Sequence, residues 1–157
     1  MALPTTPALR LLKENNVPFK AHIYKYQEHG GTEVAAQELG IDEHLVIKTL
    51  VMEDDQGKPL VVLMHGDRRV STRSLARQIG ARWVSPCEPK VAQRHTGYLV
   101  GGTSPMGLRK PLPIYMEEGI LSLPQIYING GRRGLLLEMD PKDLARILNA
   151  RTVQVAI

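Results

Sequence analysis

Val46-Ile47-Lys48-Thr49-Leu50-Val51-Met52 and Pro59-Leu60-Val61-Val62-Leu63-Met64 are two apolar runs on either side of a polar turn. The residues between them include Asp54-Asp55-Gln56-Gly57, which are residue types that tight turns favour. Two apolar runs joined in this way predict a β-hairpin, whose strands run antiparallel. The hairpin excludes a purely parallel sheet.

Short helices and strands are predicted along the rest of the chain. A capping residue or a proline marks the start of each helix, at Thr6-Pro7, Thr32, Ser71 or Thr72, Glu88-Pro89 and Asp140-Pro141. Further strands are predicted at residues 19–24, 98–100, 125–128, 135–139 and 152–157. These elements indicate a mixed α/β, α+β-like fold, in which helices surround a largely antiparallel mixed sheet or partial barrel.

The composition is that of an ordinary folded protein, and we expect a single domain over residues 1–157. No stretch stays apolar over the roughly 18 residues that a membrane helix needs, so no membrane contact is expected. The lone cysteine, Cys87, cannot form an internal disulfide, which favours a cytoplasmic location. A net charge of +4 suits a polyanionic partner without identifying one.

The sequence argues against several familiar kinds of catalytic site. Its five histidines form no pair at metal-ligand spacing and only one cysteine is present, so we expect no metal site and no cofactor. Residues 102–107 are not a P-loop, because Leu108 stands where that motif has lysine. They are not a nucleophile elbow either, because Pro105 lacks the N–H that must follow Ser104. Cys87 lies between a proline and a glutamate and is interpreted as an inert thiol.

Two remaining features each have a structural and a functional interpretation. Lys48 lies in an otherwise apolar strand, where a lysine extends along the surface to solvent, protects a sheet edge, or lines a pocket. The pair Gly101-Gly102 either makes a tight connecting turn or presents backbone N–H groups to a ligand.

A third feature repeats a pattern. Residues 127–131 have the same Tyr-x-x-Gly-Gly pattern as residues 98–102, and two arginines follow them. We interpret Arg132 as functional and Arg133 as facing solvent.

Three segments occur in a characteristic order: residues 46–51, then Val91-Ala-Gln-Arg-His-Thr-Gly-Tyr-Leu-Val-Gly-Gly-Thr-Ser-Pro-Met-Gly107, then Ile126-Tyr-Ile-Asn-Gly-Gly-Arg-Arg-Gly134. This combination resembles the YbaK/EbsC family, the free-standing relatives of the editing domain inserted in bacterial prolyl-tRNA synthetase. Residues 5–8, residues 19–24 and the final helix also fit, so the resemblance spans nearly the whole chain. It implies the fold of that editing domain.

The resemblance also implies an activity: trans-editing hydrolysis of mischarged aminoacyl-tRNA, chiefly Cys-tRNA(Pro), with the thiol of the substrate's cysteine attacking its own ester. Lys48 matches the characteristic functional residue of the family, and Gly101 matches the backbone amide expected near the ester carbonyl, so these are the expected catalytic residues. The expected substrate-binding residues are Tyr24, Thr49, Gly102, Thr103, Ser104, Pro105, Asn129, Gly130 and Arg132.

The chain departs from close YbaK relatives at three positions. Asn129 and Arg132 replace a serine and a lysine, and Thr103 replaces an aliphatic residue, which leaves the removed amino acid open. The implied partners are the acceptor end of tRNA and prolyl-tRNA synthetase, and not DNA. A non-catalytic adaptor that binds nucleotides or the tRNA acceptor end is the alternative. A small-molecule esterase is a third option, but it lacks a Ser-His-Asp arrangement.

Overall fold

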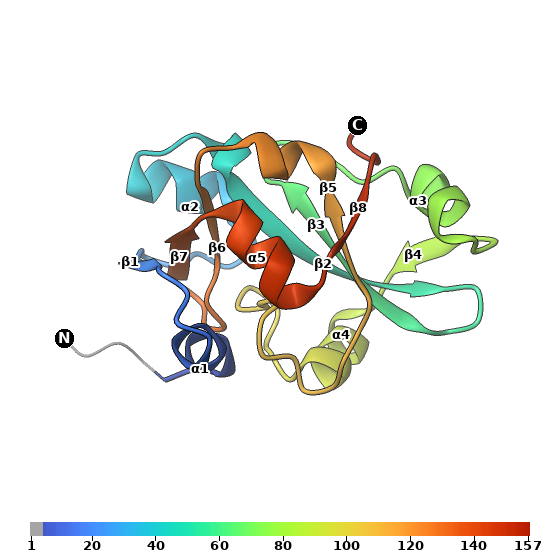
Figure 1. The fold of residues 1–157 in the computed structure, drawn as a ribbon, viewed down its shortest axis with the longest axis horizontal. Helices are drawn as coiled ribbons and strands as arrows, with labels where there is room; N and C mark the ends of the chain where they lie inside the picture. The colour runs from blue at the N-terminus through green and yellow to red at the C-terminus, as the bar shows by residue number, and fades with distance from the viewer. Residues whose placement is uncertain (1–4) are drawn as a thin grey trace.

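The computed structural model describes residues 5–157, which form a mixed eight-stranded sheet with helices packed around it (Figure 1). The strands are Lys20–Ile23 (β1), Val46–Asp54 (β2), Pro59–His65 (β3), Val84–Pro86 (β4), Ile114–Glu117 (β5), Ile126–Asn129 (β6), Leu135–Met139 (β7) and Arg151–Val153 (β8). The helices are Pro7–Glu14 (α1), Gly31–Leu39 (α2), Thr72–Ile79 (α3), Pro89–Thr96 (α4) and Pro141–Leu148 (α5), with 3₁₀ turns at Glu43–Leu45 (η1) and Glu118–Ser122 (η2).

The sheet has the order β1-β7-β6-β2-β3-β5-β8, and β4 pairs with β2 outside this path. The pairs β1–β7, β6–β7, β2–β3 and β2–β4 are antiparallel. The pairs β2–β6, β3–β5 and β5–β8 are parallel. The predicted mixed fold class is therefore confirmed.

The predicted hairpin is present and forms the centre of the sheet. Its strands β2 and β3 pair over seven residues, from Ile47 opposite His65 to Glu53 opposite Pro59. Val61 and Leu63 of β3 pack on one face with α1 and α5, whereas the alternate residues of β3 pack on the other face with α3. Both faces of β3 are buried, which explains why its sequence is apolar throughout rather than alternating.

Most helix starts agree with the caps predicted from the sequence. The hydroxyls of Thr6 and Ser71 and the carboxylate of Asp140 each accept a backbone N–H from the first turn of α1, α3 and α5. The prediction for Thr32 is wrong. Helix α2 already begins at Gly31, and the Thr32 hydroxyl instead donates to Glu43 Oε2 at 2.7 Å.

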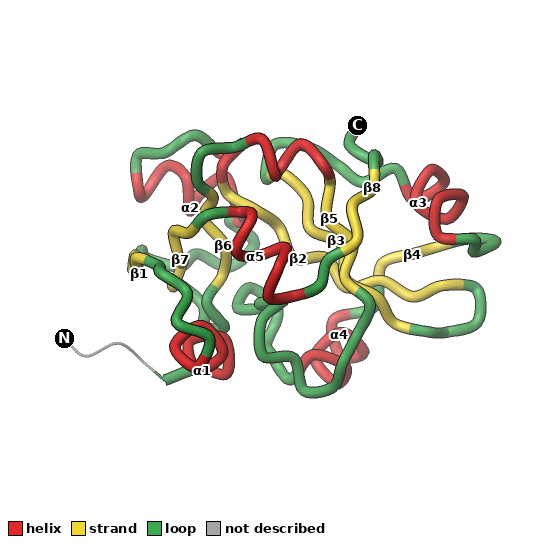
Figure 2. Tube along the Cα trace, in the orientation of Figure 1, coloured by secondary structure: helices red, strands yellow, loops and turns green. Residues whose placement is uncertain are grey.

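Two strand predictions need correction. Residues 98–100 belong to the long loop between α4 and β5, not to a strand (Figure 2). Their backbone turns at once, because Gly102 N–H donates to the Leu99 carbonyl at 2.8 Å. The last strand, β8, is shorter than predicted, and Ala156 forms only an isolated bridge with Val70. The short strands β4 and β5 lack a long apolar run and were not predicted.

Candidate functional site

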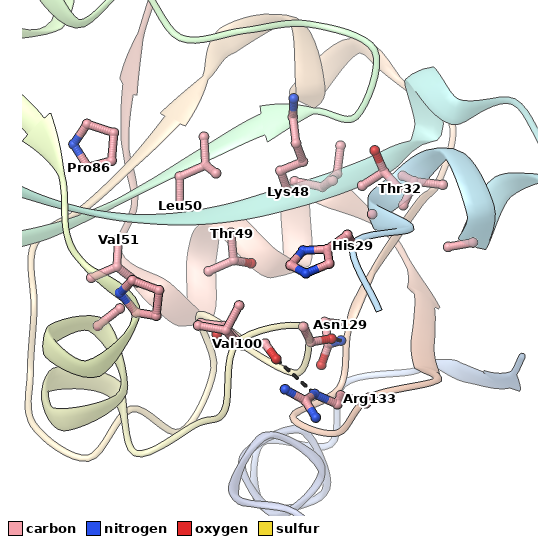
Figure 3. Close-up of a pocket in the computed structure, with 18 of the residues that line it drawn as sticks. His29, Thr32, Lys48, Thr49, Leu50, Val51, Pro86, Val100, Asn129 and Arg133 are labelled. Carbon is pink, nitrogen blue, oxygen red and sulfur yellow. Dashed lines mark hydrogen bonds between the residues drawn. The ribbon is translucent and has the colours of Figure 1, made fainter. Parts of the chain in front are cut away.

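A cavity of about 700 Å³ lies along one edge of β2 (Figure 3). Its walls come from β2, from the start of α2, from the loop after α4, and from the turn between β6 and β7. These elements are far apart in the sequence, so the cavity exists only once the sheet has assembled.

The cavity occupies a gap in the sheet. Strand β3 covers one edge of β2. The other edge is shared by two strands, because β6 pairs only with Val46 and Ile47, and β4 pairs only from Met52 onward. Residues 48–51 therefore have no strand beside them on that edge, although Cys87 N–H reaches the Val51 carbonyl at 3.0 Å. The fold leaves a short length of backbone open in the middle of its sheet.

Thr49 is at the centre of this gap. Gly66 N–H donates to the Val46 carbonyl at 2.7 Å, so Val46 is a position at which β2 bonds to β3. Every second residue of β2 after Val46 bonds to β3 in the same way, and the residues between them do not. By that alternation, the N–H and C=O of Thr49 point away from β3, toward the cavity. The Thr49 hydroxyl is also buried and has no hydrogen-bond partner within the described chain. Buried polar groups are normally paired, so Thr49 offers three groups to a ligand.

Lys48 also lines the cavity, but its side chain leaves β2 on the face opposite Thr49 (Figure 3). Its ammonium donates to the Arg68 carbonyl. Burial lowers the pKa of Lys48 below its usual value, while Glu43 opposes that shift and Arg69 adds to it. An ammonium has three N–H donors, so two remain for a ligand, and Arg69 adds a second positive charge at the same rim.

A pair of histidines fixes the backbone that Lys48 contacts. His44 Nδ1 lies 2.7 Å from Oδ1 of Asp67, the residue that precedes Arg68 in the chain. The His44 ring stacks on the His65 ring with 3.9 Å between centroids, and His65 Nδ1 lies 3.1 Å from the His44 carbonyl. Burial lowers the pKa of His65, so this buried ring favours its neutral form. These contacts hold residues 65–68 against η1 and thereby position the Arg68 carbonyl.

Gly101 lies on the opposite wall, in the loop after α4. Its φ of +90° is in the left-handed region, and a Cβ at this position would collide with the Tyr26 hydroxyl. In the described chain, the Gly101 N–H makes no backbone hydrogen bond. Gly102 differs, because its N–H donates to Leu99 and it lies outside the cavity lining. The expected pair of free amides is thus reduced to Gly101.

Ser104 and Pro105 lie beneath this loop and outside the cavity lining. Ser104 is completely buried, and its hydroxyl accepts the Met106 N–H at 3.2 Å. Thr103, by contrast, lines the cavity and is partly exposed. Ser104 therefore holds the turn, and its burial agrees with the sequence argument against a serine nucleophile.

Asn129 and Arg133 connect the two Gly-Gly segments. Asn129 Nδ2 donates to the Gly101 carbonyl at 3.1 Å, and its Oδ1 accepts the Gly131 N–H at 2.7 Å. Arg133 Nε donates to the Val100 carbonyl at 2.9 Å (Figure 3), and its guanidinium lies 5.2 Å from the ring centroid of Tyr26. The loop that carries Gly101 is thus fixed by side chains from the β6–β7 turn.

The sequence-based site residues divide into two groups. Lys48, Gly101, Tyr24, Thr49, Thr103 and Asn129 are brought together around one cavity. Gly102, Ser104, Pro105, Gly130 and Arg132 do not line it. Both arginines are exposed, as we interpreted Arg133 to be, but Arg133 and not Arg132 lines the cavity. Arg69, Tyr26 and Arg133 were missed, and only the basic pairs in the sequence hinted at the two arginines.

Cys87 lines the far end of the cavity next to β4. Burial, together with nearby Glu53, raises the pKa of its thiol to about 11. The thiolate is the nucleophilic form of cysteine, so this thiol is poorly suited to attack an ester near neutral pH.

Comparison with protein-family models gives a match to the aminoacyl-tRNA editing domain over residues 28–147, most of the chain and nearly all of the cavity. This chain belongs to the aminoacyl-tRNA editing domain family. The resemblance inferred from the sequence is confirmed, and so is the class of enzyme, an aminoacyl-tRNA deacylase. In the described part of the chain, no helix has the length and apolar character needed to cross a membrane.

Individual editing-domain relatives agree with this assignment. EbsC of Enterococcus faecalis, named as a candidate Cys-tRNA(Pro)/Cys-tRNA(Cys) deacylase, is 29% identical over 96% of this chain and 92% of its own length. A proline–tRNA ligase of Desulfotalea psychrophila is 25% identical over 83% of this chain but only 23% of the ligase. A solved structure of a candidate trans-editing enzyme for prolyl-tRNA synthetase shares the fold, with a TM-score of 0.82 and 23% identity. The match covers 98% of this chain and 99% of the chain in that structure.

Proposed function

We propose that this chain is a trans-editing deacylase that removes cysteine from Cys-tRNA(Pro), and that residues 1–157 act as one editing domain. The observation that carries the proposal is the Gly101 amide, which has no backbone hydrogen-bond partner and lines the same cavity as Thr49, where the thiol of Cys87 is not activated. The name of the Enterococcus faecalis relative supports cysteine as the amino acid and gives proline tRNA as one of two carriers.

In the proposed reaction, the ester carbonyl of the substrate accepts the Gly101 N–H. Negative charge builds on that oxygen as the bond to the attacking atom forms, and one fixed donor of this type is typically worth about 3 kcal/mol. Lys48 and Arg69 lie at the other rim, where they hold phosphate or sugar oxygens of the terminal nucleotide. Holding the ester from both sides fixes its orientation.

The substrate supplies the nucleophile in this scheme. Its cysteine sulfur forms a bond to its own ester carbon, the ester C–O bond breaks, and the thiol proton ends on the departing ribose oxygen. Water then opens the resulting thiolactone to free cysteine. The Thr49 hydroxyl and carbonyl accept hydrogen bonds from the α-amino group, which places the amino acid against the gap in β2.

Deacylation assays on the purified protein test the activity. We expect turnover of Cys-tRNA(Pro), and a fall of about a hundredfold in kcat/KM for Lys48→Ala, because the terminal nucleotide is no longer oriented. Lys58→Ala is the matched control, since Lys58 is an exposed lysine at the other end of the hairpin. Saturable tRNA binding without turnover of any mischarged tRNA would favour the non-catalytic adaptor instead.

Changing the substrate tests the mechanism. Ser-tRNA(Pro) and Ala-tRNA(Pro) present a weaker nucleophile or none, so both are expected to be hydrolysed far more slowly than Cys-tRNA(Pro) at equal concentration. Equal rates for the three would contradict attack by the substrate thiol. Repeating the series with added prolyl-tRNA synthetase measures whether that enzyme is a partner, through a change in KM.

A further inference from the structure

We propose that a second surface, formed by Arg73, Arg77, Arg82 and Trp83, binds an RNA strand of the tRNA substrate, with phosphates at the arginines and an unpaired base stacked on Trp83. We call these four residues the α3 surface. They border a shallow hollow of about 470 Å³ that is separate from the cavity at β2. The inference rests on the proposed function only for the choice of tRNA as the occupant.

The arginines of the α3 surface share one side of the molecule because of helix geometry. Arg73 and Arg77 are four residues apart, about one turn of α3, and both are exposed. Between them, Leu75 and Ala76 are buried against the sheet and fix the rotation of the helix. Arg82 follows the αL turn at Gly80 and lines the same hollow.

Trp83 is unusual for its exposure. It is the only tryptophan in the chain, and 53% of its surface is accessible, although its neighbour Val84 is buried in the core. Large aromatic side chains normally bury most of their area. An exposed ring beside arginines is the combination on which nucleic-acid bases stack while their phosphates are neutralised.

The arginines of the α3 surface make no ion pair within the described chain. The ion pairs of residues 5–157 are His22 with Glu138, His44 with Asp67, and Arg146 with Asp143, and none of them involves the α3 surface. Asp55 lies nearby and accepts the backbone N–H of Arg82 at 3.0 Å, so one carboxylate offsets part of the charge of the three arginines. Guanidinium groups without an ion-pair partner attract a polyanion, and their planar N–H donors match the geometry of phosphate oxygens.

The α3 surface adjoins the cavity at β2. Thr72, the first residue of α3, lines both hollows, and Arg69 borders the cavity three residues earlier. Helix α3 and β4 lie together at one end of the sheet (Figure 1). An RNA strand whose 3′ end enters the cavity therefore has a basic path to follow across α3. Three guanidinium groups without an ion-pair partner beside one exposed aromatic ring favour RNA over a protein partner.

Because Trp83 is the only tryptophan, its fluorescence reports on this surface alone. Titration with uncharged tRNA(Pro) transcript is expected to quench it saturably. The double variant Arg73→Gln/Arg77→Gln should weaken binding about tenfold and reduce the slope of log K against log salt by about 0.7 to 0.9 for each lost phosphate contact. Arg10→Gln/Arg151→Gln is the matched control, because both residues are exposed arginines outside the α3 surface.

A second variant tests the stacking. Trp83→Ala should weaken binding about tenfold, measured by filter binding, whereas Trp83→Phe keeps an aromatic face and should lose less. The proposal is overturned if tRNA leaves the Trp83 fluorescence unchanged, or if the arginine variants bind like the wild type. It is also overturned if prolyl-tRNA synthetase, but not tRNA, changes the fluorescence.

Failure of this inference can be told apart from failure of the proposed function. Lys48→Ala should lose turnover but keep the fluorescence response to tRNA, and the arginine variants should raise KM while leaving kcat intact. A protein that binds tRNA at Trp83 without hydrolysing any ester keeps the α3 surface and loses the proposed function. Full turnover with no effect of the arginine variants on KM would keep the proposed function and overturn the α3 surface as a tRNA-binding site.

Discussion

Residues 98–102 and residues 127–131 have the same Tyr-x-x-Gly-Gly pattern and pack against each other, yet they have different roles. The first is a loop that presents a free backbone amide at Gly101. The second continues β6 into a tight turn, from which Asn129 and Arg133 hold that loop by their side chains. A shared pattern of glycines thus supports two roles, with one segment presenting backbone and the other fixing it.

The largest effect that separates the two segments is expected at Gly101. Gly101→Ala forces a side chain into a left-handed conformation and against the Tyr26 hydroxyl, which displaces the amide from the ester. We expect kcat/KM to fall about a hundredfold in the deacylation assay. Because a left-handed backbone strains alanine even if the partly exposed Tyr26 moves aside, the free energy of unfolding should also fall, by about 1 kcal/mol.

Gly131→Ala is the counterpart in the second segment. A Cβ there would meet the ring of Tyr98, which is buried and held by its hydroxyl bond to the Met106 carbonyl at 2.6 Å. Because Tyr98 cannot move, we expect a loss of about 2 kcal/mol in the free energy of unfolding. That corresponds to a fall in Tm of about 4 to 8 °C by calorimetry. If Gly131→Ala reduced kcat as strongly as Gly101→Ala, the division of roles would be wrong.

The two arginines after β6 sharpen the comparison further. Arg133→Gln removes the donor to the Val100 carbonyl and the contact with Tyr26, so the loop that carries Gly101 loosens. We expect a fall of about tenfold in kcat/KM, close to what one charged hydrogen bond is worth. Arg132→Gln, one residue earlier, leaves these contacts intact. A larger effect at Arg132 than at Arg133 would restore the interpretation drawn from the sequence.

The smallest effect is expected at Tyr98. Burial raises the pKa of its hydroxyl from 10 to about 12, so the folded state binds this proton more tightly than the unfolded state. Its contribution to stability is complete below pH 10 and is lost as the pH rises toward about 12. Tyr98→Phe should cost about 1 kcal/mol at neutral pH and reduce the loss between pH 10 and about 12. Urea unfolding of both proteins across that range measures the difference.

The parts of the fold that sequence reasoning predicted are those set by local chemistry. The hairpin follows from two apolar runs and their turn, and the start of α1 follows from Thr6-Pro7. Residues 98–100 were predicted as a strand because their side chains are apolar or aromatic. Their loop conformation depends instead on Tyr98 packing against residues 106 and 131, contacts that the local sequence does not contain.

The candidate site shows the same division. Lys48 and Gly101 stood out as residue types that are unusual in their local setting, but only the family resemblance assigned them to a site. The orientation of Arg133 could not be predicted from the sequence, because it depends on the Asn129 side chain, which accepts two backbone N–H groups of the same turn. The gap beside Thr49 was also not predictable, because the lengths over which β6 and β4 pair with β2 decide it.

That gap has a mechanical consequence. The strands β1, β7 and β6 are joined to the remaining strands through two residue pairs only, Val46 with Tyr127 and Ile47 with Ile128. The cavity lies next to this narrow seam, so the width of its opening depends on how the buried side chains of the two parts of the sheet pack across the seam. If the proposed function holds, substitutions of buried side chains along the seam are expected to change which amino acid fits, although none of them contacts the ester.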